Sequence, residues 1–126
     1  MTVALERRLL QIIVAVACCV PVFGGLWGIW HGTGRAGDID SHYRYLSGLL
    51  LGIGLAFASS ITRIEDHAER FRLLTAIVVL GGLARLAGMI MAGAPSLSME
   101  LAMVMEIVVT PVLCLWQNSL ARRYPG

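Results

Sequence analysis

The sequence has 126 residues, of which 57% are hydrophobic and only 14% are charged. A soluble domain of this size would lack the polar residues needed to cover its surface, so the composition excludes that class and favours a polytopic membrane protein. The net charge of +2 is too small to indicate a nucleic-acid partner. Because no polar stretch is long enough to fold separately, we expect a single membrane domain over residues 1–126.

Four apolar segments follow one another along the chain, over residues 9–30, 43–61, 73–94 and 97–116. Each is close to the ~20 residues that a helix needs to cross the hydrocarbon core of a bilayer. Over such a length in lipid, only helices satisfy the backbone hydrogen bonds unless a barrel closes. The sequence therefore predicts an all-α fold, a bundle of four transmembrane helices.

The arginines are distributed unevenly between the two predicted sides of the membrane. Two stand on the side of the first and third connections, Arg35 and Arg44. The other side carries Arg7, Arg8, Arg63, Arg70, Arg72, Arg122 and Arg123. Since cytoplasmic loops are enriched in basic residues, this asymmetry predicts that both termini and the second connection are cytoplasmic.

Arg85 lies inside the third apolar segment, where a charge costs from ~3 to more than ~10 kcal/mol, depending on the reference system. Glu106 is its candidate partner. Arg85 precedes Gly93 by eight residues, which is roughly 12 Å along a helix, and Glu106 follows Leu97 by nine, which is roughly 13 Å. Because a very short turn joins the two segments into an antiparallel hairpin, the charges should meet at one depth. The pair could fix helix register only, bind a ligand or proton, or contact another subunit.

Pro111 follows Glu106 closely in the fourth segment. A proline inside a helix removes one backbone donor and frees a carbonyl one turn earlier. We expect a kink here, with Thr110 satisfying part of the disturbed backbone. Such a kink could open space near the carboxylate of Glu106.

A second polar cluster is predicted near the outer ends of the helices. It comprises Asp40, His42, Tyr43, Arg44 and Glu100. Arg44 could pair with Asp40 or with Glu100, and a histidine can titrate near neutral pH. These residues could line a polar funnel that leads down to Arg85.

Small residues recur at four-residue spacing along the segments, and such faces let membrane helices approach closely. The glycines that we expect at packing interfaces are Gly48, Gly52, Gly81 and Gly88. The contacts could lie within the bundle, in a homo-oligomer or in a larger membrane complex. The sequence contains no CxxC, HExxH or Cys/His cluster, so we expect neither a metal nor a cofactor.

Several strings together resemble those of an uncharacterised family of small four-helix bacterial membrane proteins, catalogued as a domain of unknown function. They are residues 41–48 (SHYRYLSG), 70–74 (RFRLL) and 81–86 (GGLARL), with Met105 and Glu106 ahead of Thr110 and Pro111. The family is similar in architecture to the DoxX-like membrane proteins. The resemblance implies a multi-pass protein of the bacterial inner membrane and supplies no activity.

Three functional hypotheses follow. The first is an accessory or structural subunit of a membrane assembly, which agrees with the short loops and the lack of a catalytic motif. The second is a binder or carrier of a small lipophilic or anionic molecule, held by Arg85 and Glu106. The third is a membrane oxidoreductase component, which rests on architecture alone.

Overall fold

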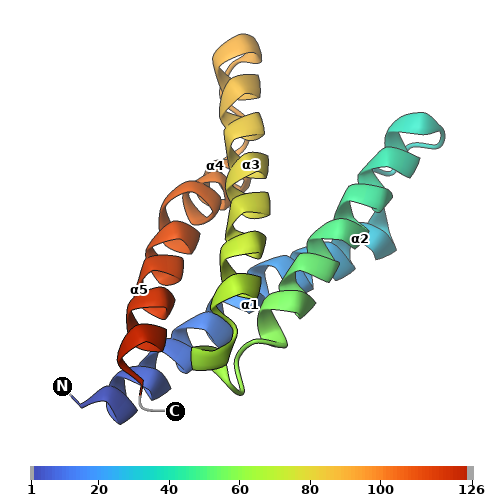
Figure 1. Cartoon of the computed structure of the whole chain (residues 1–126). Coiled ribbons are helices and arrows are strands. Elements are labelled where there is room, and N and C mark those ends of the chain that lie inside the picture. The colour runs from blue at the N-terminus through green and yellow to red at the C-terminus, as the bar shows by residue number, and fades with distance from the viewer. Residues whose placement is uncertain (1, 125–126) are drawn as a thin grey trace. The chain divides into compact units, whose positions relative to one another are not determined.

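The computed structural model describes residues 2–124, and all regular elements in that range are helical (Figure 1). In chain order they are α1 (Val3–His31), α2 (Asp38–Ala58), the 3-10 helix η1 (Ile64–Asp66), α3 (Ala68–Ala92), α4 (Leu97–Val104), the π-helical segment η2 (Met105–Val109) and α5 (Thr110–Arg123). The prediction of an all-α fold is confirmed for these residues.

Three helices within the described range are long and apolar enough to cross a membrane. They are Val3–His31, Ala68–Ala92 and the continuous run Leu97–Arg123. This is the signature of a multi-pass membrane protein. α2, which carries Asp38 and Asp40 in its first turn, is not among the three. A fourth span, and the orientation of the termini, stay predictions.

The helices extend beyond the apolar segments at several ends. α1 includes Glu6, Arg7 and Arg8, and α3 starts at Ala68, several residues before its first long apolar run. α3 ends where Gly93 adopts a φ of +95°, a conformation that glycine reaches without a Cβ clash. Pro95 follows two residues later and cannot continue a helix. The four residues 93–96 then join α3 to α4 as an antiparallel hairpin.

The described residues fall into two compact units. One runs from Gln11 to Arg63, and the other combines the residues up to Leu10 with those from Ile64 onward. This division follows contacts within the chain, so the predicted single membrane domain stays a prediction.

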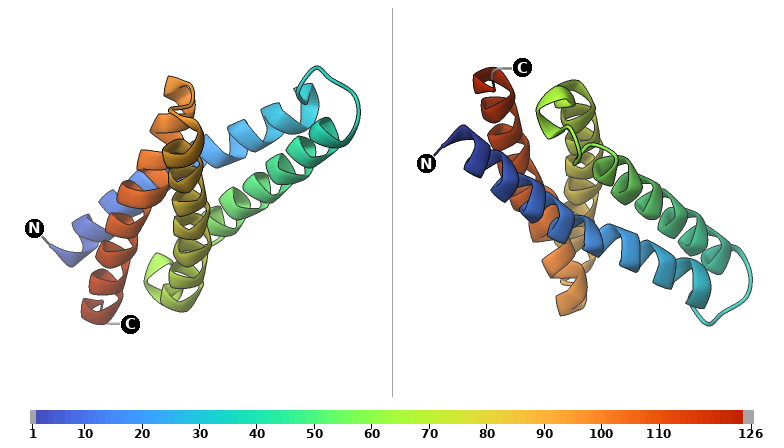
Figure 2. Two further views of the ribbon diagram at one scale, coloured as in Figure 1. Left: turned by 90° about the horizontal axis from the view of Figure 1, so that it is seen from above. Right: turned by 90° about the horizontal axis from the view of Figure 1, so that it is seen from below.

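In the unit formed by residues 11–63, the second half of α1 packs against α2, which runs back alongside it (Figure 2). Gly25 makes the approach close: a Cβ at this position would lie 2.7 Å from the backbone nitrogen of Leu51 and from the carbonyl oxygen of Ser47. Gly54 of α2 meets Val22 in the same way, at 2.8 Å. Small residues thus bring these two backbones together, as is usual in membrane helices.

Three of the glycines predicted for packing have open surroundings. No heavy atom outside their own helix lies within 4 Å of a Cβ built at Gly48, Gly52 or Gly88. Within each unit, the close contacts are made at other glycines, among them Gly25, Gly54 and Gly82. A packing role for these three stays a prediction for Gly48, Gly52 and Gly88.

In the other unit, polar side chains tie the start of α1 to the end of α5, which lie side by side (Figure 1). Glu6 accepts a hydrogen bond from the indole Nε1 of Trp116 at 2.8 Å and forms an ion pair with Arg123. Arg7 pairs with Glu65 of η1 at 2.7 Å. The buried Gln117 of α5 donates to the carbonyl oxygen of Ile64 at 2.6 Å.

Candidate functional site

Arg85 of α3 and Glu106 of η2 form an ion pair between the two arms of the hairpin. The Arg85 Nε lies 2.8 Å from Oε1 of Glu106, and the two side chains are 38% and 18% exposed. The guanidinium Nη1 also donates to the thioether sulfur of Met99 in α4 at 3.1 Å. The side chain of Arg85 therefore crosses from α3 to the opposite arm of the hairpin.

The contact between Arg85 and Glu106 has the distance of an ion pair but not the alignment of a hydrogen bond. Oε1 of Glu106 is buried, and no donor among the described residues is directed at it. The Nη2 group of Arg85 likewise has no acceptor in that part of the chain. Both partners thus keep hydrogen-bonding capacity that no further contact within their own unit fills.

Glu106 stands in a π-helical segment rather than at a simple kink. Pro111 has no N–H to complete the preceding turn. The hydroxyl of Thr110 donates to the carbonyl oxygen of Met105 at 2.8 Å, and the Thr110 N–H bonds to the same oxygen. Single π turns inside α-helices are frequent at functional sites. This distortion presents Glu106 and Ile107 to α3.

Two adjacent glycines of α3 lie against the residues of this π-helical turn. A Cβ at Gly82 would lie 2.8 Å from Ile107 and 2.9 Å from the Cβ of Glu106, so only glycine fits there without a shift. Gly81 is exposed, and a Cβ there would lie 3.8 Å from Oε2 of Glu106. Gly81 is among the glycines that sequence spacing predicts at packing interfaces, whereas Gly82 is not. The glycine pair three and four residues before Arg85 was the signal available.

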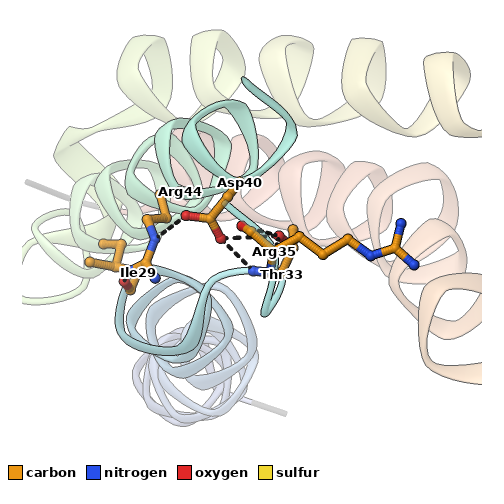
Figure 3. A network of polar contacts seen from close by, with 5 residues as sticks. All are labelled: Ile29, Thr33, Arg35, Asp40 and Arg44. Atoms are coloured by element: carbon orange, nitrogen blue, oxygen red, sulfur yellow. Dashed lines mark hydrogen bonds and ion pairs between the residues drawn. The ribbon is translucent and has the colours of Figure 1, made fainter. Parts of the chain in front are cut away.

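The outer cluster divides between the two units. In the unit of residues 11–63, Arg44 pairs with Asp40 at 2.8 Å and donates to the carbonyl oxygen of Ile29 (Figure 3). Asp40 also accepts the backbone N–H of Thr33 at 2.7 Å. These bonds, from Thr33 first and Arg44 second, hold the pKa of Asp40 below its ordinary value. Asp40 and Arg44 thereby close the connection between α1 and α2.

The connection between α1 and α2 also requires a glycine at the end of α1. Gly32 has a φ of +60°, and a Cβ there would collide with Asp40 and with the guanidinium of Arg44. Arg35, in the same connection, points its side chain away from this network (Figure 3). The cluster therefore has a structural explanation as a clasp at the end of a helical hairpin.

His42 and Tyr43 line a shallow surface hollow, together with Thr33, Asp38, Ile39 and Leu46. Glu100 lies in the first turn of α4, in the other unit. A shared funnel from this cluster to Arg85 stays a prediction. Within residues 2–124, no three His, Cys, Asp or Glu side chains gather in a way that could hold a metal ion.

A family model described as a domain of unknown function (DUF4345) matches residues 9–117 of the sequence. That range includes Arg85, Glu106, the glycine pair and the outer clasp. No curated protein and no solved structure matches the sequence significantly.

Proposed function

Since this chain belongs to the DUF4345 family, whose function is not known, we propose a role from its own site: a membrane protein that binds a small lipophilic molecule at Arg85 and Glu106. The observation that carries the proposal is the incompletely bonded guanidinium of Arg85. It has one ion contact and one bond to a thioether, which is a weak acceptor.

The position of Arg85 makes this unfilled capacity costly. Arg85 precedes Ala92, the last residue of α3, by seven residues, which is about 10 Å along the helix. Charged side chains at membrane depth normally face an interior and are fully paired, and they mark substrate or ion pathways. A side chain that is 38% exposed at this depth needs an acceptor from outside the hairpin. A bound molecule with an oxygen acceptor would supply it.

The membrane setting of the proposal has four spans with both termini in the cytoplasm of a bacterium. The uneven distribution of arginines supports the orientation. The apolar second half of α2, from Leu46 to Ala58, supports a fourth span. An inner-membrane location and an architecture like that of DoxX-like proteins belong to the same proposal.

Co-purification tests the proposal directly. We compare wild type, Arg85→Gln and Arg122→Gln, each purified in mild detergent, and identify extracted small molecules by mass spectrometry. Arg122 is an exposed arginine near the end of α5 and serves as the matched control. We expect one species at near-stoichiometric amount in wild type and the control, and its loss in Arg85→Gln with helicity unchanged by circular dichroism. Equal amounts of that species in all three proteins would refute the binding role of Arg85.

The second candidate function is an accessory subunit of a membrane assembly. The observation that favours it is the open pair Gly48 and Gly52, one turn apart on α2, with no heavy atom from elsewhere in residues 11–63 within 4 Å of an added Cβ. Such small-residue faces are typical helix contacts in membranes. Gly52→Leu should release a partner during purification, whereas Ala36→Leu at an exposed position in the connection should not. Retention of every partner by Gly52→Leu contradicts this role.

A further inference from the structure

The carboxylate of Glu106 has two unequal oxygens. Only Oε1 is buried, and it faces Arg85. Oε2 is the oxygen nearest to Gly81, which is exposed and lies one turn before Arg85 on α3. With no side chain at position 81, the surface beside this acceptor is open: among the described residues, Oε2 would be the one atom outside α3 within 4 Å of a Cβ there. We call this open surface the gap at Gly81.

The charges at this gap cancel. Arg85 contributes one positive charge and Glu106 one negative charge, 2.8 Å apart at their nearest atoms. An anionic ligand held by the guanidinium would also be repelled by the adjacent carboxylate, over nearly the same distance. A neutral molecule meets no such repulsion and can use both groups.

Resting on the proposed function, we propose that the ligand is a neutral lipophilic molecule with a carbonyl acceptor and a hydroxyl donor a few bonds apart. The carbonyl accepts from the free Nη2 of Arg85, and the hydroxyl donates to Oε2 of Glu106 through the gap at Gly81. Gly81 is then a residue that determines specificity, because any side chain there stands between the ligand hydroxyl and Oε2. A hydroxy ester or hydroxy ketone on an alkyl chain has this chemistry.

Three probes with the same twelve-carbon acyl chain separate the possibilities. Monododecanoylglycerol is neutral and carries carbonyl and hydroxyls, methyl dodecanoate is neutral with an acceptor only, and dodecanoate is an anion. Radiolabelled probes are bound at equilibrium to the full chain in phosphatidylcholine nanodiscs. A hydrogen bond to a charged group contributes enough for a difference of about tenfold or more in affinity. We expect the glycerol ester to bind about tenfold more tightly than the other two probes.

The variants test the gap itself. Gly81→Val should lose this preference, whereas Gly88→Val should keep it. Gly88 lies two turns later on the same side of α3, is exposed, and has no atom from the described residues outside α3 within 4 Å of an added Cβ. Gly88→Val therefore controls for the effect that a glycine-to-valine change has on helix stability. Helicity by circular dichroism checks that both variants fold.

The outcomes separate the two proposals. If dodecanoate binds as tightly as the glycerol ester, or if Gly81→Val and Gly88→Val behave alike, the neutral-ligand inference is wrong while a site at Arg85 can stand. If Arg85→Gln changes the binding of none of the probes, the proposed function fails with it. If no probe binds to wild type, the hydroxy-ester class is excluded.

Discussion

Removing the charges of Arg85 and Glu106, singly and together, should show whether the ion pair only stabilises the helical hairpin or also binds a ligand. Breaking a fully buried pair by removing one partner costs about 3–5 kcal/mol, whereas exposed pairs contribute about 0–1 kcal/mol. The side chains here are 38% and 18% exposed, so they fall between these limits. We expect Arg85→Leu and Glu106→Leu each to lower the free energy of unfolding by about 1–3 kcal/mol. The double variant should be close to wild type, because it leaves no unpaired charge.

The assay is reversible unfolding by SDS in mixed micelles, followed by circular dichroism, with Arg122→Leu as the exposed control. Because each single variant loses about 1–3 kcal/mol and the double variant stays close to wild type, the expected coupling energy between the two sites is about 2–6 kcal/mol. If the two single effects add in the double variant, the charges do not interact and the reasoning from their 2.8 Å contact is wrong. A double variant that is stable but no longer retains the co-purifying molecule shows that the pair binds a ligand. One that is stable and retains it shows a lock only.

Two further predictions concern the unit of residues 11–63. In the same SDS assay, the free energy of unfolding of Gly25→Ala should be lower than that of Gly24→Ala by about 1–3 kcal/mol. The reason is that a Cβ at position 25 would lie 2.7 Å from the Leu51 nitrogen, whereas a Cβ at position 24 meets nothing closer than 3.8 Å. Equal stabilities of the two variants would contradict the close approach of the helices. Because the folded pKa of Asp40 is lowered by the Thr33 N–H and then by Arg44, its stabilisation is full above the unfolded pKa of about 4 and is lost as the pH falls below it. The thermal midpoint of wild type should therefore fall more between pH 6 and pH 3 than that of Asp40→Asn, and parallel profiles would show that Asp40 does not contribute.

Hydropathy predicted which segments of this chain are helical more accurately than it predicted the residues at which each helix begins and ends. It reports which residues prefer lipid, whereas a helix continues into water as long as its backbone bonds are satisfied. Glu6, Arg7 and Arg8 are helical for that reason. The partners of Glu6 and Arg7, which are Glu65, Trp116 and Arg123, lie far away in the sequence. No local sequence pattern predicts those pairs.

The contact at the candidate site could be predicted because, in an antiparallel helical hairpin, the number of residues from the turn gives the distance along each helix. Counting residues from the turn put Arg85 and Glu106 at one level, and in the structure their nearest atoms are 2.8 Å apart. The π turn at Met105–Val109 could not be read in this way. It adds one residue to a turn without changing composition, and its bond from Thr110 to Met105 becomes visible only in three dimensions.

Glycine spacing identified helices able to pack closely but not the side that does so. Gly48 and Gly52 form a regular four-residue pattern and lie open within their own unit, whereas Gly25, Gly54 and Gly82 make close contacts within theirs. A four-residue repeat fixes one face of a helix, and the choice between faces depends on the partner helix. That choice is decided by tertiary contacts that the sequence does not display.

The unit that contains residues up to Leu10 and from Ile64 onward has a consequence for biosynthesis. Glu6 and Arg123 are separated by 117 positions, so at about 5–20 residues per second roughly 6 to 23 s pass between the synthesis of one and the other. Residues 11–63 are contiguous and can pair while translation continues. The other unit closes only after Trp116 and Arg123 have left the ribosome, so Glu6 at the start of α1 waits for its partners through most of translation. A nascent chain halted before Trp116 would therefore hold the hairpin of α1 and α2 but not the bonds of Glu6.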